Sequence, residues 1–129
     1  MSLENPTFVS LPQVMRAHRA SLEAHGGIDG VRDHGAVESA LASAQNAWLY
    51  GNGDIFDIAA TYAFHIAESQ AFLDGNKRTA IATALTFLAL NGAYATPDQG
   101  ELYDAMIAIS ARRMDKVGLA AVLRKQFPR

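Results

Sequence analysis

Residues 76–91 read Asn-Lys-Arg-Thr-Ala-Ile-Ala-Thr-Ala-Leu-Thr-Phe-Leu-Ala-Leu-Asn, and this stretch decides the fold class. Alanine and leucine favour a helix, and small or apolar side chains occupy nearly every side of it. A helix without a polar face has to be covered by other elements. We therefore predict a buried central helix from about Asn76 to Asn91, stopped by Gly92.

Five further helices are predicted, because the other apolar residues recur mostly at spacings of three and four. Their predicted N-caps are Ser10, Asp33, Asp54, Thr96 and Asp115, and Asp57 follows Asp54 at capping-box spacing. The expected ranges are Leu11 to His25, Asp33 to about Asn46, about Ile55 to Ser69, Pro97 to Arg112, and Asp115 to about Gln126.

The remaining segments are too short for a sheet. Phe8 to Val9 and Ala93 to Ala95 could pair locally but could not support a sheet alone, and the chain has no repeat or linker. We predict an all-α fold: a compact single-domain bundle of about six helices around a buried central helix, with residues 1–129 as one domain.

Composition limits the classes of function. The 129 residues are enough for one core, and 50% hydrophobic with 19% charged residues is typical of a globular domain. A formal net charge of -2 argues against direct nucleic-acid binding, which favours a basic excess. The absence of cysteine excludes disulfides and thiolate sites. No apolar run reaches the roughly 18 residues of a membrane span, so we expect no membrane contact and a cytoplasmic protein.

Chemistry is expected at residues 70–79, Gln-Ala-Phe-Leu-Asp-Gly-Asn-Lys-Arg-Thr, where charges gather at the start of the most apolar helix. A helix N-terminus attracts anions, Gly75 lets backbone approach a phosphate, and Lys77 and Arg78 add cationic donors. Asp74 could hold a Mg²⁺ that bridges phosphate oxygens. The pattern therefore predicts a phosphate-binding site.

The same pattern allows a simpler interpretation. Asp74 or Asn76 would only cap the helix, and Lys77 and Arg78 would form its solvated first turn. The residues alone leave both interpretations open.

The stretch Phe72-Leu-Asp-Gly-Asn-Lys-Arg-Thr-Ala80 resembles the core motif of the Fic/Doc (Fido) family. It has the form of the death-on-curing toxin branch, usually His-x-Phe-x-Asp-x-Asn-Lys-Arg-Thr. The resemblance extends upstream through the glycines and acidic residues of Gly26 to Leu41 and downstream from Ala84 to Gly92, and it covers roughly Phe8 to Gln126.

The resemblance implies a helical Fido fold that uses ATP and Mg²⁺ to modify a hydroxyl of a target protein. Members with Gly after the motif Asn typically transfer AMP, whereas death-on-curing toxins have Lys there, as in Lys77, and resemble kinases that phosphorylate elongation factor Tu. Toxins of this branch are normally neutralised by an antitoxin protein, which is therefore an expected partner.

The resemblance also implies roles for individual residues. Asp74 would bind the metal, Gly75 and Asn76 would line the phosphate pocket, and Lys77 and Arg78 would hold phosphate oxygens. Phe72 would be a packing anchor for the loop.

Gln70 departs from the family pattern, because it stands where the family has its catalytic histidine. A glutamine amide can orient the attacking hydroxyl but cannot accept its proton, and loss of a general base typically costs about 10² to 10⁴ in rate. Phosphoryl transfer asks relatively little of a base. Three alternatives to an active kinase stay open: a Fido pseudoenzyme that only binds nucleotide or partner, an AMP transferase, and a DNA-binding protein disfavoured by charge.

The other polar and aromatic features receive structural interpretations. His65 lies five residues before Gln70, so on a helix it should face elsewhere and pack. We expect structural or exposed positions for His18, His25 and His34, and helix capping or a partner contact for Arg112, Arg113 and Lys116. Around the turn at residues 51–53 we expect three core aromatics, with a binding platform at the substrate groove as the alternative: Trp48, Tyr50 and Phe56.

Overall fold

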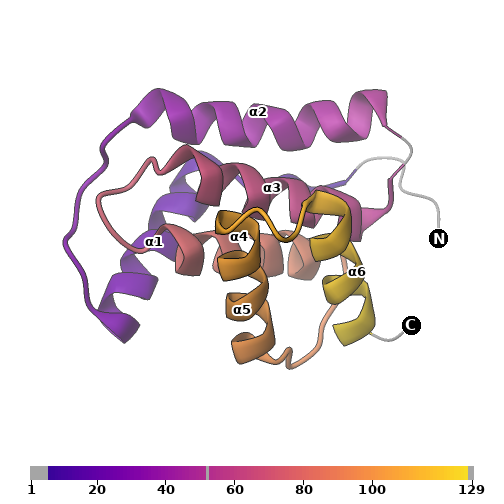
Figure 1. Cartoon of the computed structure of the whole chain (residues 1–129). Coiled ribbons are helices and arrows are strands. Elements are labelled where there is room, and N and C mark those ends of the chain that lie inside the picture. Colours follow the sequence, from indigo (N-terminus) through magenta and orange to yellow (C-terminus); the bar gives the residue numbers. More distant parts are fainter. Residues whose placement is uncertain (1–5, 52, 128–129) are drawn as a thin grey trace.

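The computed structural model describes residues 6–51 and 53–127, and this part of the chain is all-helical, as predicted. Its only β pairing is an isolated antiparallel bridge between Val31 and Phe72. The helices are α1 (Leu11–His25), α2 (His34–Tyr50), α3 (Ile55–Ser69), α4 (Asn76–Leu90), α5 (Gln99–Ser110) and α6 (Lys116–Gln126), shown in Figure 1.

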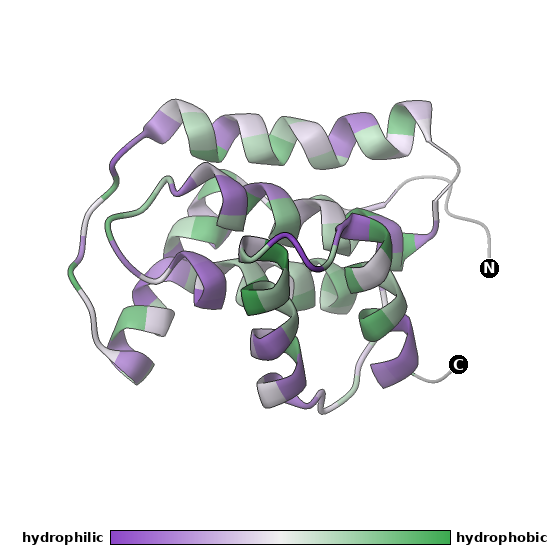
Figure 2. Ribbon diagram, viewed as in Figure 1, coloured by the Kyte–Doolittle hydropathy of each residue, from purple (hydrophilic) through white to green (hydrophobic). Residues whose placement is uncertain are grey.

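Two helices share the centre of the bundle. α3 packs against α2, α4, α5 and α6, while α4 packs against α1, α3 and α5 (Figure 1). The sequence predicted α4 as the central helix, and α4 is buried along seven of its residues, but α3 is buried along ten. Hydrophilic residues gather at the start of α5 and at the end of α6 (Figure 2). The apolar core is therefore built around the α3 and α4 pair.

Local capping explains where most helices begin. Ser10 and Gln13 form a capping box at α1, and Asp33 accepts a hydrogen bond from the Ala36 amide at α2. Asp54 and Asp57 form the predicted capping box at α3, with the Asp54 amide donating to Asp57 Oδ2 at 2.9 Å. These starts follow the cap predictions.

The predicted bounds of two helices are wrong. α2 continues four residues past Asn46 to Tyr50, because nothing interrupts the helical run before Gly51, whose amide donates to the Ala47 carbonyl. α5 begins at Gln99 instead of Pro97, because Asp98 and not Thr96 is the N-cap. It ends at Ser110 instead of Arg112, because the backbone of Arg112 is left-handed, with φ 60°.

A second contact explains why Asp98 takes the cap of α5. Its side chain accepts from the Glu101 amide at 3.1 Å, and its own amide donates to Gln126 Oε1 at 2.8 Å. The end of α6 therefore helps to fix the start of α5.

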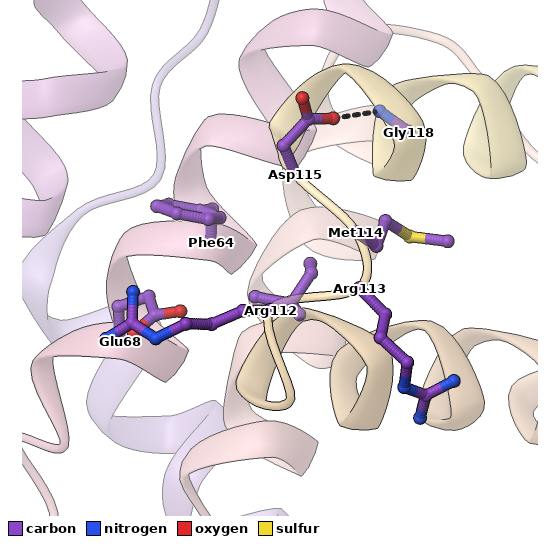
Figure 3. A pocket seen from close by; sticks show the side chains of 8 residues that line it. Phe64, Glu68, Arg112, Arg113, Met114, Asp115 and Gly118 are labelled. Carbon is purple, nitrogen blue, oxygen red and sulfur yellow. Dashed lines mark hydrogen bonds between the residues drawn. The ribbon is translucent and has the colours of Figure 1, made fainter.

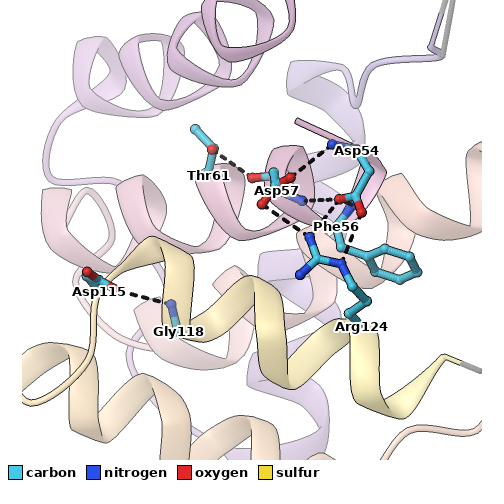
Figure 4. Close-up of polar contacts among 7 residues, drawn as sticks. All are labelled: Asp54, Phe56, Asp57, Thr61, Asp115, Gly118 and Arg124. Carbon is cyan, nitrogen blue, oxygen red and sulfur yellow. Dashed lines mark hydrogen bonds and ion pairs between the residues drawn. The ribbon is translucent and has the colours of Figure 1, made fainter. Parts of the chain in front are cut away.

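α6 is tied to the start of α3 by Arg124 (Figure 4). Its guanidinium donates to both carboxylate oxygens of Asp54 at 3.0 Å and to Asp57 Oδ1 at 3.3 Å. Burial on its own would raise the pKa of Asp54, but the bonds from Arg124 and from the Asp57 amide outweigh it, and this pKa is lowered. The three side chains form a charged clamp on the outside of the bundle.

The N-terminal segment does not pair with residues 93–95. The Thr7 amide donates to Asn91 Oδ1 at 2.8 Å, and the Val9 amide donates to the Tyr62 hydroxyl at 2.9 Å. Burial raises the pKa of Tyr62 to about 12. The segment is therefore held by side chains of α3 and of the α4 end.

The aromatic residues near the turn after α2 divide between core and surface. Phe56 is buried, and Trp48 is partly buried with its ring edge-on to Phe8 at 6.3 Å. Tyr50, predicted as a core residue, is 86% exposed because α2 carries it past the edge of the bundle. Asn52 of the predicted turn lies outside the described residues.

No helix in the described part of the chain combines the length and the apolar character needed to cross a bilayer.

Candidate active site

The candidate site is the loop of residues 70–75 that joins α3 to α4, together with the first turn of α4. Gln70 ends α3 in a left-handed conformation with φ 52°, and Gly75 precedes α4 with φ 78°. Because glycine has no side chain, Gly75 adopts this left-handed conformation without steric cost. These two residues turn the chain from one central helix into the other.

The segment between α1 and α2 fixes one side of this loop. The amides of Arg32 and Asp33 donate to the Ala71 carbonyl at 2.7 and 3.1 Å. The Leu73 amide donates to the Gly30 carbonyl at 3.1 Å, across the bridge of Val31 and Phe72. The loop is therefore paired along its length with backbone about 40 residues earlier.

Asn76 closes the loop from the other side. The Phe72 amide donates to Asn76 Oδ1 at 3.0 Å, and Asn76 Nδ2 donates to the Phe72 carbonyl at 2.9 Å. The Phe72 side chain is fully buried, in keeping with the predicted packing anchor. Because Oδ1 and Nδ2 of Asn76 are both hydrogen-bonded within the loop, the side chain closes the loop. Only the backbone N–H of Asn76 is left for a ligand.

The first turn of α4 leaves its amide groups available. The N-cap is Gly75, and no side chain caps the helix, so the simpler interpretation of Asp74 or Asn76 as a cap is wrong. The first backbone hydrogen bond of α4 runs from the Thr79 amide to the Gly75 carbonyl, at 2.9 Å. In the described chain the amides of Asn76, Lys77 and Arg78 have no acceptor. Such a free helix start attracts anions.

Asp74 lies beside this helix start with its side chain exposed. One carboxylate oxygen, Oδ2, accepts from the Ile28 amide at 3.0 Å. The described residues contain no cluster of three or more histidine and acidic side chains that could hold a metal. Mg²⁺ is commonly bound through one or two carboxylates together with phosphate oxygens and water. The single Asp74 carboxylate beside an anion site fits that mode of binding.

The two cations of the motif occupy the first turn of α4 and are partly buried. Arg78 stacks on Tyr103 of α5, with its Cζ 4.2 Å from the ring centroid, and lines a cavity of about 230 Å³ between α1 and α4. A stacked guanidinium keeps the N–H groups of its edge free for oxygens. Asp74, Gly75, Asn76, Lys77 and Arg78 are consecutive in the chain, so their backbones lie together at the start of α4.

Gln70 lies at the other end of the loop, with its side chain exposed. His65 does not take its place: the ring of His65 is half-buried, and its Nε2 lies 3.5 Å from Lys116 Nζ on α6. Burial lowers the pKa of His65, and the charge of Lys116 lowers it further. His65 therefore packs between α3 and α6, as predicted.

A groove of about 590 Å³ lies between α3, α5 and α6 (Figure 3). Arg112 and Arg113 line it, but they do not cap α5 through their side chains. Their backbone amides donate to the carbonyls of Ile109 and Ala108, and Arg112 has φ 60°. The backbone caps the helix, and Figure 3 shows the Arg112 side chain directed toward Glu68 and the Arg113 side chain directed away from it.

One residue that lies against the loop, His18, was not predicted to belong to the site. His18 of α1 is buried beneath residues 72–75, whereas His25 and His34 are exposed. The only available signal was its position in the apolar stripe of α1.

Comparisons with known proteins agree with the motif. The model of the Fic/DOC family matches residues 8–88. The protein kinase doc of Escherichia phage P1 is 31% identical over 120 residues, which are 92% of this chain and 94% of that protein. The toxin Doc of Mycolicibacterium smegmatis is 39% identical over 105 residues, which are 78% of this chain and 80% of that protein. The family match includes the whole 70–75 loop and most of α4.

Proposed function

Because the chain belongs to the Fic/DOC family, we propose that it is a death-on-curing toxin that transfers phosphate from ATP to a hydroxyl of a target protein. The similarity to the phage P1 kinase and to the mycobacterial toxin supports this class of activity. The target follows from the family resemblance: elongation factor Tu, in the cytoplasm.

The observation that carries the proposal is the uncapped start of α4. Three free backbone amides lie at one helix end, Lys77 and Arg78 belong to its first turn, and the helix dipole adds positive potential there. A polyphosphate would find amide donors and two cations in one place. In this arrangement Gly75 and Asn76 line the phosphate pocket through their backbone, and Lys77 and Arg78 bind phosphate oxygens.

Asp74 is the proposed ligand for Mg²⁺, through the carboxylate oxygen that Ile28 leaves free. When bound, the ion would neutralise charge on the phosphate oxygens during transfer. The Ile28 amide holds the carboxylate in place beside the helix start. Asp74 thus orients the nucleotide relative to Lys77 and Arg78.

Lys77 favours phosphoryl over AMP transfer, because family members with glycine at that position typically transfer AMP. A lysine side chain there adds a point charge directly at the pocket, where the charge of the transferred group has to be stabilised.

Gln70 sets the expected rate. Its exposed amide orients the target hydroxyl by a hydrogen bond, while the proton leaves to water, so the reaction is slower than with histidine. The same residue favours one second candidate, a pseudoenzyme that binds nucleotide or a partner without transfer. In either case an antitoxin protein is the proposed partner, and no direct nucleic-acid contact is proposed.

Growth of a bacterial host after induction tests the toxin proposal. We expect slower growth with the protein as it stands, stronger arrest with Gln70→His, and normal growth with Asp74→Ala at equal expression. Arrest that persists at full strength in Asp74→Ala would refute a metal-dependent transferase. Arrest only in Gln70→His would favour the pseudoenzyme.

A further inference from the structure

His18 contacts the candidate site from below. Its side chain is 2% exposed, and its ring stacks on Phe72 with 3.9 Å between centroids and 15° between planes. Its Nε2 lies 2.9 Å from the Asp74 carbonyl oxygen. A carbonyl oxygen only accepts hydrogen bonds, so Nε2 carries a hydrogen and donates it.

This contact joins α1 to the loop across 56 residues of sequence. Gly75 lies against the same ring, since a Cβ placed on it would be 3.7 Å from His18 Cδ2. The imidazole therefore contacts the Phe72 ring and the Asp74 carbonyl, and it leaves room for only a small residue at position 75.

Asp74 is held on two sides as a result. His18 binds its backbone carbonyl, and the Ile28 amide binds its carboxylate at 3.0 Å. If the backbone of Asp74 shifts, the direction of its carboxylate and the position of the helix start shift with it. The buried imidazole N–H needs an acceptor, and the acceptor here is the backbone of the residue proposed to bind the metal.

We propose that His18 is a positioning residue for the nucleotide site: its Nε2–H fixes the Asp74 backbone, and so directs the carboxylate and the free amides of α4 at the same phosphate. This inference rests on the proposed function, since it assigns His18 a part in binding Mg²⁺ and ATP. It requires no contact between His18 and the nucleotide.

Two substitutions separate the hydrogen bond from the stacking. His18→Gln loses the ring but keeps an N–H donor at about the reach of Nε2. His18→Asn has the same amide on a side chain one methylene shorter, which cannot reach the Asp74 carbonyl. Ser21→Ala is the control on α1, because the Ser21 hydroxyl is also buried but bonds only within the helix, to the Ala17 carbonyl at 2.9 Å.

The first readout is the affinity for ATP with Mg²⁺, measured by calorimetry. Loss of one hydrogen bond that orders the loop corresponds to about a tenfold weaker affinity. We expect this tenfold loss in His18→Asn, an affinity within about threefold of the parent in His18→Gln, and no change in Ser21→Ala. Equal affinities in His18→Gln and His18→Asn would overturn the proposal.

The second readout does not need the nucleotide. The amides of Phe72 and Leu73 are hydrogen-bonded within the loop, so their hydrogen exchange reports its opening. We expect exchange about tenfold faster in His18→Asn than in His18→Gln. Equal rates would overturn the positioning role. If the parent protein binds no ATP, the proposed function fails, while this comparison still decides the role of His18.

Discussion

Asn76→Ala is the substitution that bears most directly on how the site is built. Asn76 bonds both polar groups of the Phe72 backbone, at 3.0 Å and 2.9 Å. Neither group has another partner in the described chain. Phe72 itself is fully buried, so in Asn76→Ala its N–H and C=O lose their hydrogen bonds in a place that water reaches poorly.

The expected loss of stability follows from the unpaired N–H and C=O groups of Phe72. A buried polar group left without a partner costs about 1–3 kcal/mol. Asn76 is itself only partly buried, so some water would enter, and we expect a total loss of about 2–3 kcal/mol in the free energy of unfolding. For a domain of this size that corresponds to a Tm lower by about 6–15 °C.

Urea unfolding followed by circular dichroism measures the loss, and Asn91→Ala is the matched control. At the other end of α4, the Asn91 amide bonds the Thr7 backbone in the same two-way manner, at 2.8 and 2.9 Å, and also the Phe87 carbonyl. Thr7 is exposed, so water replaces part of these bonds and the expected cost is only about 1 kcal/mol.

The two asparagines should differ more clearly in ligand binding. Asn76→Ala loosens the loop that carries Asp74, so its affinity for ATP with Mg²⁺ should fall by about tenfold or more. Asn91→Ala should bind as the parent does. A urea midpoint for Asn76→Ala equal to that of the parent, or an equal affinity for both variants, would refute the view that Asn76 closes the site.

Three further substitutions test the metal, the charged clamp and the histidine of α3. Asp74→Asn keeps an acceptor for the Ile28 amide but removes the charge, so calorimetry should find ATP affinity that no longer depends on Mg²⁺; a retained dependence would exclude Asp74 as ligand. Arg124→Gln should cost up to about 1 kcal/mol of stability near neutral pH. Because the pKa of Asp54 is lowered in the folded protein, this contribution is present above about pH 3.9 and is lost as the pH falls through the folded-state pKa. The free energies of unfolding of the parent and of Arg124→Gln should therefore converge in acid. A difference that stays constant with pH would contradict the clamp. Lys116→Gln should raise the pKa of His65 in an NMR titration, since one of the two causes that lower it is removed; an unchanged value would leave burial as the only cause.

The helices were predictable wherever a local signal marks their ends. Ser10 with Gln13 and Asp54 with Asp57 are capping pairs three residues apart, and the bounds predicted for α1 and α3 agree with the structure. The error at α5 arose because Thr96 and Asp98 are both good caps, and a distant side chain, Gln126, decides between them.

The site was predictable as a motif but not as a geometry. The motif residues of the 70–79 stretch and the family followed from the sequence, and the family match confirms the resemblance. The loop-closing role of Asn76 and the contact of His18 with Asp74 depend on how three segments meet in space. No periodicity or cap pattern carries that information, so the sequence assigned Asn76 to the phosphate pocket or to a helix cap, and His18 to a structural or exposed position.

The most direct measurement of the central claim is transfer of label from ATP carrying ³²P at either the α or the γ position. Purified elongation factor Tu is the acceptor, and the protein is compared with Gln70→His and with Asp74→Ala. We predict slow transfer of the γ label by the protein, faster transfer by Gln70→His and none by Asp74→Ala. Transfer of the α label, or no transfer by either the protein or Gln70→His, would contradict a kinase of this family.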